Sequence, residues 1–249
     1  MALYDPASIK QRKKLLDFEN NTNISLRNRY VYFAVDKVAN SSIKNSLFDI
    51  EYAPVGKKTV TLYDKRSSPL LSPYQLPPDL LREVLNSGNY FRFAFVRNPY
   101  SRLLSCYLDR ILTASSKPRR QLNAYLKGRG EPTEDVTFES FIRAICAQNS
   151  NTQNSHWRVQ ADDILFGDVE FDFIGKFERL WQDMAVVSSR IWGELRPEMA
   201  NKDVNKSPRA TNAGGKLREF YTPELAALVA DRFAADFDAF EYERDISTY

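Results

Sequence analysis

The stretch YVYFAVDKVANSSIKNSLF, residues 30–48, sets the expected fold. It begins with six mostly aromatic and β-branched residues, 30–35, whose length and composition are typical of a buried strand. A polar turn over 36–40 follows the run. The rest predicts the start of a helix, because three apolar residues fall on one helical face: Ile43, Leu47 and Phe48. The order of strand, tight turn and helix is typical of an α/β protein.

The turn in this stretch is a candidate anion site. Ser41 or Ser42 is suited to cap the helix, since a serine hydroxyl accepts a hydrogen bond from a free first-turn N–H. A helix N-terminus also turns several N–H groups and the positive end of its dipole toward a phosphate, and Lys37 adds a full charge. The glycines of a Walker A loop are absent, so an ordinary connection with a solvated lysine is the alternative.

A second strand–turn–helix unit follows over 91–108. The run FRFAFV, 91–96, predicts a strand, and Pro99 suits the first turn of the next helix. Arg97 ends the strand, and Ser105 lies about two turns into the helix. Open α/β sheets bind ligands at the carboxyl edge of their strands, so Arg97 is a candidate ligand-binding group. Its alternative is a surface ion pair.

The remaining pattern predicts one α/β domain over residues 1–249, with a central, mostly parallel sheet flanked by helices. Basic residues at 117–120 and 127–130 predict a solvated loop, with a docking surface for an anionic acceptor as the alternative. The irregular segments are expected at 50–72 and at 196–215, the second with the composition of a mobile cover. A third strand is expected at 171–177, and helices at 6–18, 80–85, 138–147, 178–195 and 225–237.

Composition excludes several classes of protein. The 249 residues include 35 basic and 32 acidic ones, a near balance that argues against a general nucleic-acid binder. No apolar run approaches the roughly 18–20 residues of a membrane span, and the polar N-terminus does not resemble a signal peptide. Cys106 and Cys146 predict free thiols in a reducing compartment, with a disulfide as the alternative. We therefore expect a soluble, cytoplasmic protein.

Several segments resemble the PAPS-dependent carbohydrate sulfotransferases of the chondroitin and HNK-1 type, sulfotransferase family 2. DKVANSSIK, 36–44, resembles their 5′-phosphosulfate loop, and FAFVRNPYSRLLSCY, 93–107, is similar to their 3′-phosphate motif. The family loop commonly has proline where Asp36 stands. Animal members also carry an N-terminal membrane anchor, and because the polar N-terminus here does not resemble one, we expect a soluble relative of bacterial type. Three further segments also look familial: HWRVQ at 156–160, FDFIGKFERL at 171–180 and DFDAFEY at 236–242.

The resemblance implies a P-loop-NTPase-like sulfotransferase fold and transfer of a sulfonyl group from 3′-phosphoadenosine 5′-phosphosulfate (PAPS) to a hydroxyl of a carbohydrate or glycoconjugate. It implies that Lys37 neutralises the leaving phosphate oxygen without a metal, and that Arg97 and Ser105 hold the 3′-phosphate. A P-loop-like nucleotide kinase and a catalytically inactive binding protein of this fold are the alternatives. The 5′-phosphate would lie on the loop residues Lys37, Val38, Ala39, Asn40, Ser41 and Ser42.

A transfer to a hydroxyl needs a general base, and His156, the single histidine, is the first candidate. Trp157 is expected either to stack on a sugar or to pack in the core. Lys216 and Arg218 follow the cover segment, which is expected to close over the nucleotide. The acceptor and the oligomeric state are left open by the sequence. Three carboxylates are rivals for the role of the base: Asp162, Asp163 and Glu51.

Overall fold

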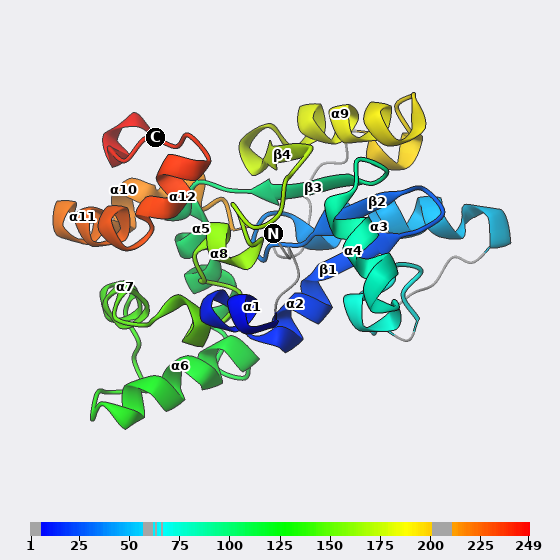
Figure 1. The fold of residues 1–249 in the computed structure, drawn as a ribbon. Helices are drawn as coiled ribbons and strands as arrows, with labels where there is room; N and C mark the ends of the chain where they lie inside the picture. Colours follow the sequence, from blue (N-terminus) through cyan, green and yellow to red (C-terminus); the bar gives the residue numbers. More distant parts are fainter. Residues whose placement is uncertain (1–5, 57–61, 63, 66, 201–210) are drawn as a thin grey trace.

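A computed structural model describes residues 6–56, 62, 64–65, 67–200 and 211–249 (Figure 1). Its sheet has the order β1-β2-β3-β4, with β1 antiparallel to β2 and the other neighbours parallel. The three expected strands are confirmed, one of them to the residue, and the short β1 was not predicted. The strands are β1 (Thr22–Ser25), β2 (Tyr30–Phe33), β3 (Phe91–Val96) and β4 (Phe173–Lys176).

The register of the parallel strands brings two turns to one edge of the sheet. Tyr30 lies opposite Phe91, and Phe33 lies opposite Ala94, so β2 and β3 run side by side to their carboxyl ends. The turns that begin at residues 34 and 97 therefore leave the sheet together, as the sequence predicts for a ligand site. The helices α7, α10, α11 and α12 lie beyond this end of β3 (Figure 1).

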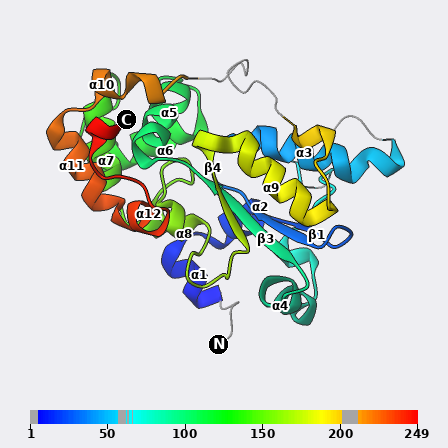
Figure 2. The ribbon, with the colours of Figure 1, turned by 90° about the horizontal axis from the view of Figure 1, so that it is seen from above.

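Helices cover both faces of the sheet, with α3 and α4 on opposite sides of the strands (Figure 2). The buried apolar residues form one continuous cluster. A π-helical turn, Tyr107–Ile111, continues α5. The helices are α1 (Pro6–Arg12), α2 (Leu15–Asn21), α3 (Asn40–Tyr52), α4 (Pro78–Asn86), α5 (Pro99–Cys106), α6 (Lys117–Gly128), α7 (Phe138–Cys146), α8 (Gln160–Asp163), α9 (Leu180–Trp192), α10 (Leu217–Phe220), α11 (Pro223–Arg232) and α12 (Ala234–Ala239).

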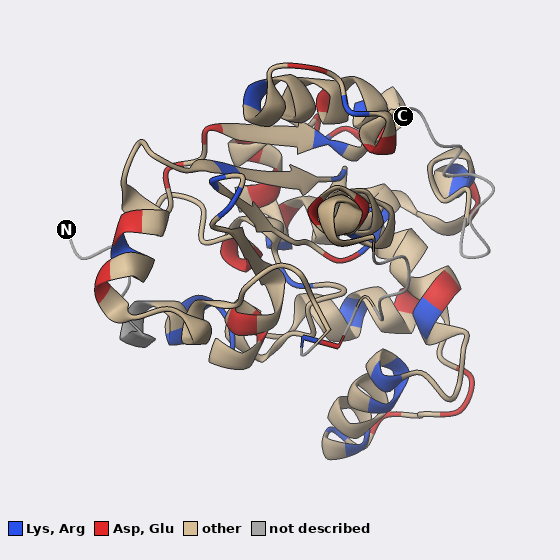
Figure 3. Cartoon of the chain, turned by 90° about the vertical axis from the view of Figure 1, so that its right-hand side faces the viewer, with Lys and Arg blue, Asp and Glu red and all other residues tan. Residues whose placement is uncertain are grey.

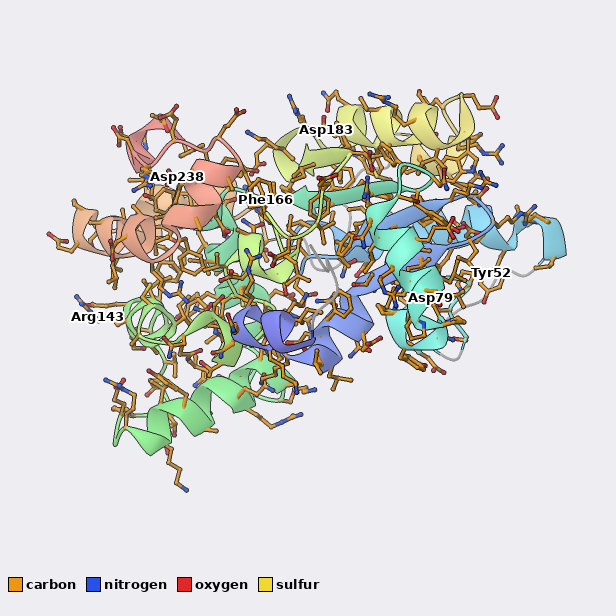
Figure 4. The ribbon with its side chains drawn as sticks, in the orientation of Figure 1. Tyr52, Asp79, Arg143, Phe166, Asp183 and Asp238 are labelled. Atoms are coloured by element: carbon orange, nitrogen blue, oxygen red, sulfur yellow. The ribbon has the colours of Figure 1, made fainter. Side chains whose placement is uncertain are left out.

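Close packing explains the glycine in β4. A Cβ atom on Gly175 would overlap the ring of Phe95 in the neighbouring strand. The end of β4 is held from the next helix, because the Asp183 carboxylate accepts a hydrogen bond of 2.6 Å from the backbone N–H of Lys176. Asp183 lies at the start of α9, above the sheet (Figure 4).

Two expected helices are interrupted in the structure. The first, 6–18, is divided into α1 and α2, and Phe18 is buried while Leu16 is 68% exposed. The last, 225–237, is divided into α11 and α12 at Phe233. The two parts pack against different elements, α2 against β1 but α1 against residues 150–152, and α11 against α7 but α12 against α8, so one straight helix would not reach both.

The solvated loop expected at 117–130 is wrong for most of its length, because residues 117–128 form α6. Ser116 caps this helix by accepting a hydrogen bond from the N–H of Arg119, and proline occupies the first turn. Leu122 and Leu126 lie on the buried face of this helix. Basic residues nevertheless occur at both ends of the helix (Figure 3), so the basic segment is a helix and not a loop.

The irregular segments are described only in part. The helix α3 continues to Tyr52, beyond the start of the connection expected at 50–72, and Leu71 forms a bridge with Ile24 of β1. In the cover expected at 196–215, residues 201–210 lie outside the described residues.

Cys106 and Cys146 are free, as predicted. Within the described part of the chain, no helix has the length and apolarity needed to cross a membrane.

Candidate functional site

The turn after β2 has the backbone shape of an anion site. Lys37 and Ala39 adopt left-handed conformations, with φ of 72° and 62°. Such residues in a turn arrange backbone N–H groups around a concave space that suits an anion. The helix α3 begins at Asn40 with Ala39 as its N-cap residue, so the expected serine cap is wrong. Both serines lie instead in the first turn of α3, close to the positive end of the helix dipole.

The side chains of this turn fix its position on the sheet. Val38 is fully buried, so its side chain anchors the turn in the core. Asn40 is also buried, and its Oδ1 accepts a hydrogen bond of 3.3 Å from the Tyr32 hydroxyl. The turn is therefore held in shape before any ligand binds. The apolar face predicted for α3 is confirmed, since its three residues are buried: Ile43, Leu47 and Phe48.

Lys37, the expected catalytic cation, is paired with a carboxylate. Its Nζ lies 2.6 Å from Oδ2 of Asp109, and both side chains are about one-tenth exposed. Asp109 belongs to the π-helical turn after α5, and its Oδ2 also lies 3.0 Å from Nε of Arg110. π-Helical turns occur often at functional sites. Asp109 therefore occupies one of the three N–H donors of the Lys37 ammonium group and competes for its charge with any other anion.

Arg97 joins the two turns at the sheet edge. Its Nη1 donates a hydrogen bond of 3.1 Å to the carbonyl oxygen of Lys37, and its Nε donates to the Ser101 hydroxyl at 2.9 Å. The guanidinium lies over the ring of Phe177, 4.1 Å from its centre. Burial lowers the pKa of Arg97 to about 10, which leaves it charged at neutral pH. The Arg97 side chain is therefore a fixed cation beside the turn that carries Lys37.

Ser105, the second residue expected at the 3′-phosphate, is buried on α5. Its hydroxyl oxygen accepts a hydrogen bond of 3.2 Å from Thr211, the first described residue after the segment 201–210. No hydrogen bond joins Ser105 to Arg97 among the described residues. The end of the expected cover segment thus reaches Ser105, whereas Lys216 and Arg218 lie in the helical turns that follow.

Residues far away in sequence hold the backbone of Arg97. The Gln160 side chain accepts a hydrogen bond from the N–H of Arg97 at 2.9 Å and donates one to its carbonyl at 2.8 Å. The Asp236 carboxylate in turn accepts bonds from the N–H groups of Gln160 and Ala161, at 2.9 and 2.8 Å. The sequence did not predict these roles. Its only signal was that Gln160 and Asp236 lie in the segments 156–160 and 236–242, which resemble the family.

Arg102 links the turn after β2 to the segment that carries His156. This fully buried guanidinium donates to the carbonyl oxygens of Asp36, Arg158 and Ser155, at 3.0, 2.7 and 2.9 Å. Arginine suits this position because its planar fork directs several N–H groups to separate acceptors. Arg102 was also missed as a site residue, since nothing in its local sequence shows which distant carbonyls it meets.

His156 lies beside Asp36. Its Nδ1 is 2.8 Å from Oδ1 of Asn154 and 3.4 Å from Oδ2 of Asp36, and that Asp36 oxygen accepts a hydrogen bond of 2.6 Å from the Ser155 hydroxyl. Burial alone would raise the pKa of Asp36, but His156, Ser155 and nearby cations together lower it to about 2. Burial lowers the pKa of His156 below its ordinary value, and Asp36 partly opposes this.

A cavity of about 530 Å³ opens beside these groups. Its wall includes His156 and Asp36 and carries five basic residues against two carboxylates. Burial lowers the pKa of Lys65 in this wall to about 7, and the neighbouring Lys44 adds to the effect. A bound anion would therefore favour the charged form of Lys65. The basic residues are Lys14, Lys44, Lys65, Arg110 and Lys117, and Asp17 is the second carboxylate.

The rival bases have other partners and do not line this cavity. Asp162 pairs with Arg12 at 2.9 Å, Asp163 is buried against Lys13 and Arg158, and Glu51 accepts a hydrogen bond of 2.8 Å from Asn28.

Trp157 is 1% exposed, and its Nε1 donates to the Gln148 side chain. The stacking of Trp157 on a sugar is therefore wrong, and the packing alternative is confirmed. Within the described part of the chain, no group of three or more histidine, cysteine, aspartate or glutamate residues is arranged to hold a metal ion.

Comparisons with known proteins agree with the sequence motifs. Residues 20–243 match the model described as the sulfotransferase family. The chain is similar to carbohydrate sulfotransferase 14 of Danio rerio, with 31% identity over 189 residues, 73% of this chain and 50% of that protein. It is 30% identical to the Homo sapiens carbohydrate sulfotransferase 14 over 181 residues, 70% of this chain and 46% of that protein.

A more distant relative is carbohydrate sulfotransferase 10 of Xenopus laevis, with 24% identity over 183 residues, 64% of this chain and 50% of that protein. The chain thus spans about half the length of the curated relatives that it matches. No solved structure matches it.

Proposed function

Because the chain belongs to the sulfotransferase family, we propose that it transfers a sulfonyl group from PAPS to a hydroxyl of a carbohydrate or glycoconjugate. The observation that carries this proposal is the hydrogen bond from Arg97 to the carbonyl of Lys37. It holds the Arg97 guanidinium against the backbone of the turn that carries Lys37, so two cationic residues occupy adjacent turns of one sheet edge. PAPS carries anionic groups at both its 3′ and 5′ positions, so two neighbouring cations suit it better than a ligand with one phosphate.

The proposed roles follow from these positions. The backbone N–H groups over 38–42 would hold the 5′-phosphate, and Arg97 and Ser105 would hold the 3′-phosphate. Lys37 would leave Asp109 and neutralise the phosphate oxygen on which charge develops. Ser105 would exchange its contact with Thr211 for the ligand. The chemistry needs positioning and charge stabilisation more than a covalent intermediate.

The acceptor would lie in the cavity, with His156 as the base. As the acceptor oxygen bonds to sulfur, the sulfur–oxygen bond to the 5′-phosphate breaks, and its electron pair stays on the phosphate oxygen beside Lys37. The hydroxyl proton passes to His156, whose lowered pKa keeps it neutral and able to accept at neutral pH. The excess of basic residues in the wall favours an acceptor with acidic groups.

Binding of adenosine 3′,5′-bisphosphate tests the donor site directly. We expect calorimetry to show binding without magnesium, and Arg97→Ala to weaken it by about tenfold or more, since an arginine–phosphate contact is a strong, charge-assisted bond. Arg97→Lys keeps the positive charge but lacks the planar N–H donors of the guanidinium, so it separates the effect of the charge from that of the lost hydrogen bonds. Arg143→Ala is the matched control, because Arg143 pairs with Glu139 on the outside of α7 (Figure 4). Binding of ATP with magnesium alone would favour the kinase alternative.

A turnover assay with labelled PAPS and a panel of carbohydrates tests the reaction itself. Label should pass to a carbohydrate in the presence of EDTA, because the proposed mechanism uses no metal. Donor binding without transfer to any acceptor would favour the catalytically inactive alternative.

Three expectations stay predictions: a single domain over 1–249, the lack of nucleic-acid partners and a cytoplasmic location. The last rests on the two free thiols, which suit a reducing compartment.

A further inference from the structure

We propose that Asp36 is a positioning residue that, with Asn154, holds the His156 imidazole with its proton on Nδ1 and its Nε2 lone pair available to the acceptor. This inference rests on the proposed function and adds a residue to it. It concerns an interaction between two segments more than one hundred residues apart, the turn after β2 and the segment before α8.

Asn154 determines which nitrogen of the imidazole carries the proton. Its Oδ1 accepts a hydrogen bond of 2.9 Å from the backbone N–H of His156, and its Nδ2 donates to the Gln121 side chain on α6. This pattern fixes the amide orientation, because a flipped amide would place two donors against each other. The same Oδ1 lies 2.8 Å from Nδ1 of His156. An acceptor at that distance requires a proton on Nδ1, so Nε2 is left with the lone pair.

Asp36 supplies the negative charge on the same side of the ring. Its Oδ2 lies 3.4 Å from Nδ1 and is held by the Ser155 hydroxyl, while Arg102 holds its backbone carbonyl. The carboxylate is therefore fixed independently of the histidine. When Nε2 takes a proton, the imidazolium forms beside a carboxylate already in place, which stabilises it without movement. Among the described residues, Nε2 has no hydrogen-bond partner, and His156 lines the cavity.

Charges from other elements act against Asp36. Lys37 in the same turn, Arg102 on α5 and Arg110 in the π-helical turn all disfavour the imidazolium. Without the carboxylate, these three cations and burial would act on the histidine unopposed. The pKa of His156 is therefore expected to fall when the charge of Asp36 is removed.

The single histidine makes a direct test possible. In a chain without a histidine tag, ¹⁵N-labelled histidine gives nuclear magnetic resonance signals from His156 alone. We expect the wild-type neutral imidazole to carry its proton on Nδ1. In Asp36→Asn, the pKa of His156 should fall by about one pH unit, and kcat at pH 7.5 should fall about tenfold, a part of what a general base supplies.

Asp238→Asn is the control, since Asp238 lies on the exposed side of α12 and pairs with Arg244 (Figure 4). It should leave the tautomer, the pKa of His156 and kcat unchanged. Binding of adenosine 3′,5′-bisphosphate by Asp36→Asn shows whether the variant folds. A wild-type proton on Nε2, or an unchanged pKa of His156 in a folded Asp36→Asn, would overturn the inference. The resonance signals of His156 can be measured without turnover. An enzyme inactive on every carbohydrate would therefore refute the proposed function and leave the measured tautomer and pKa of His156 unaffected.

Discussion

The Lys37–Asp109 pair predicts that removing a carboxylate will strengthen donor binding. In the structure without ligand, Lys37 Nζ lies 2.6 Å from Asp109, and both side chains are about one-tenth exposed. In the proposed binding mode, Lys37 turns from this partner to the anionic ligand. The free energy of binding therefore includes the loss of the ion pair, which Asp109→Asn removes beforehand while it keeps the shape of the side chain.

The size of the effect follows from the position of the pair. Exposed ion pairs contribute about 0.2–1 kcal/mol, and breaking a fully buried pair costs about 3–5 kcal/mol. The Lys37–Asp109 pair lies between these cases, and Arg110 stays beside Asp109 when Lys37 leaves. We therefore take about 1 kcal/mol, which corresponds to an approximately fivefold lower Kd. The lost repulsion between Asp109 and an anionic ligand acts in the same direction.

Calorimetry with adenosine 3′,5′-bisphosphate measures this difference. Asp79→Asn is the control, because Asp79 forms an exposed pair with Arg82 at the start of α4 (Figure 4), and its Kd should equal that of the wild type. A weaker Kd in Asp109→Asn would refute the reasoning. It would show that Asp109 holds Lys37 in its binding position instead of competing with the ligand.

Three further predictions concern stability, pH and the thiols. Gly175→Ala should destabilise the fold by about 1–3 kcal/mol in urea unfolding, because its methyl group overlaps Phe95, whereas Gly88→Ala meets no atom within 4 Å and serves as the control. The value of kcat/KM should fall as the pH drops through the lowered pKa of His156, because only the neutral imidazole accepts a proton; an acid limb above the ordinary histidine pKa would contradict this. Burial raises the pKa of Cys106 and Cys146 to about 12, so a thiol reagent at pH 8 should react slowly with the native chain and quickly in urea, and equal rates would contradict the burial.

The strands and the two turns were predictable because their signals are local. A continuous apolar run such as 91–96 has few alternatives to a buried strand, and Arg97 follows it directly. The start of α6 also has a local signal, the serine and proline at 116–118, although the charge of the segment favours a solvated loop. The short β1 carries no such run, and it forms because its four residues pair with β2.

The missed site residues share a different property, since each acts on the backbone of a distant segment. Gln160 meets Arg97 across 63 positions, and Arg102 meets Asp36 across 66. No periodicity or cap encodes such partners, because the fold itself creates them. The position of His156 against Asp36 belongs to the same class.

These long-range bonds explain how one chain can place the proposed donor site and the proposed base together. Arg102 holds the carbonyl of Asp36 in the turn after β2 and the carbonyl of Ser155 beside His156, so the two segments move as one unit. Gln160 attaches the following helix to Arg97. A lysine at 102 would keep the charge but could not reach three carbonyls in one plane. The two turns and the Arg97 side chain are thus fixed before any ligand binds, which reduces the energy needed to arrange them as charge develops.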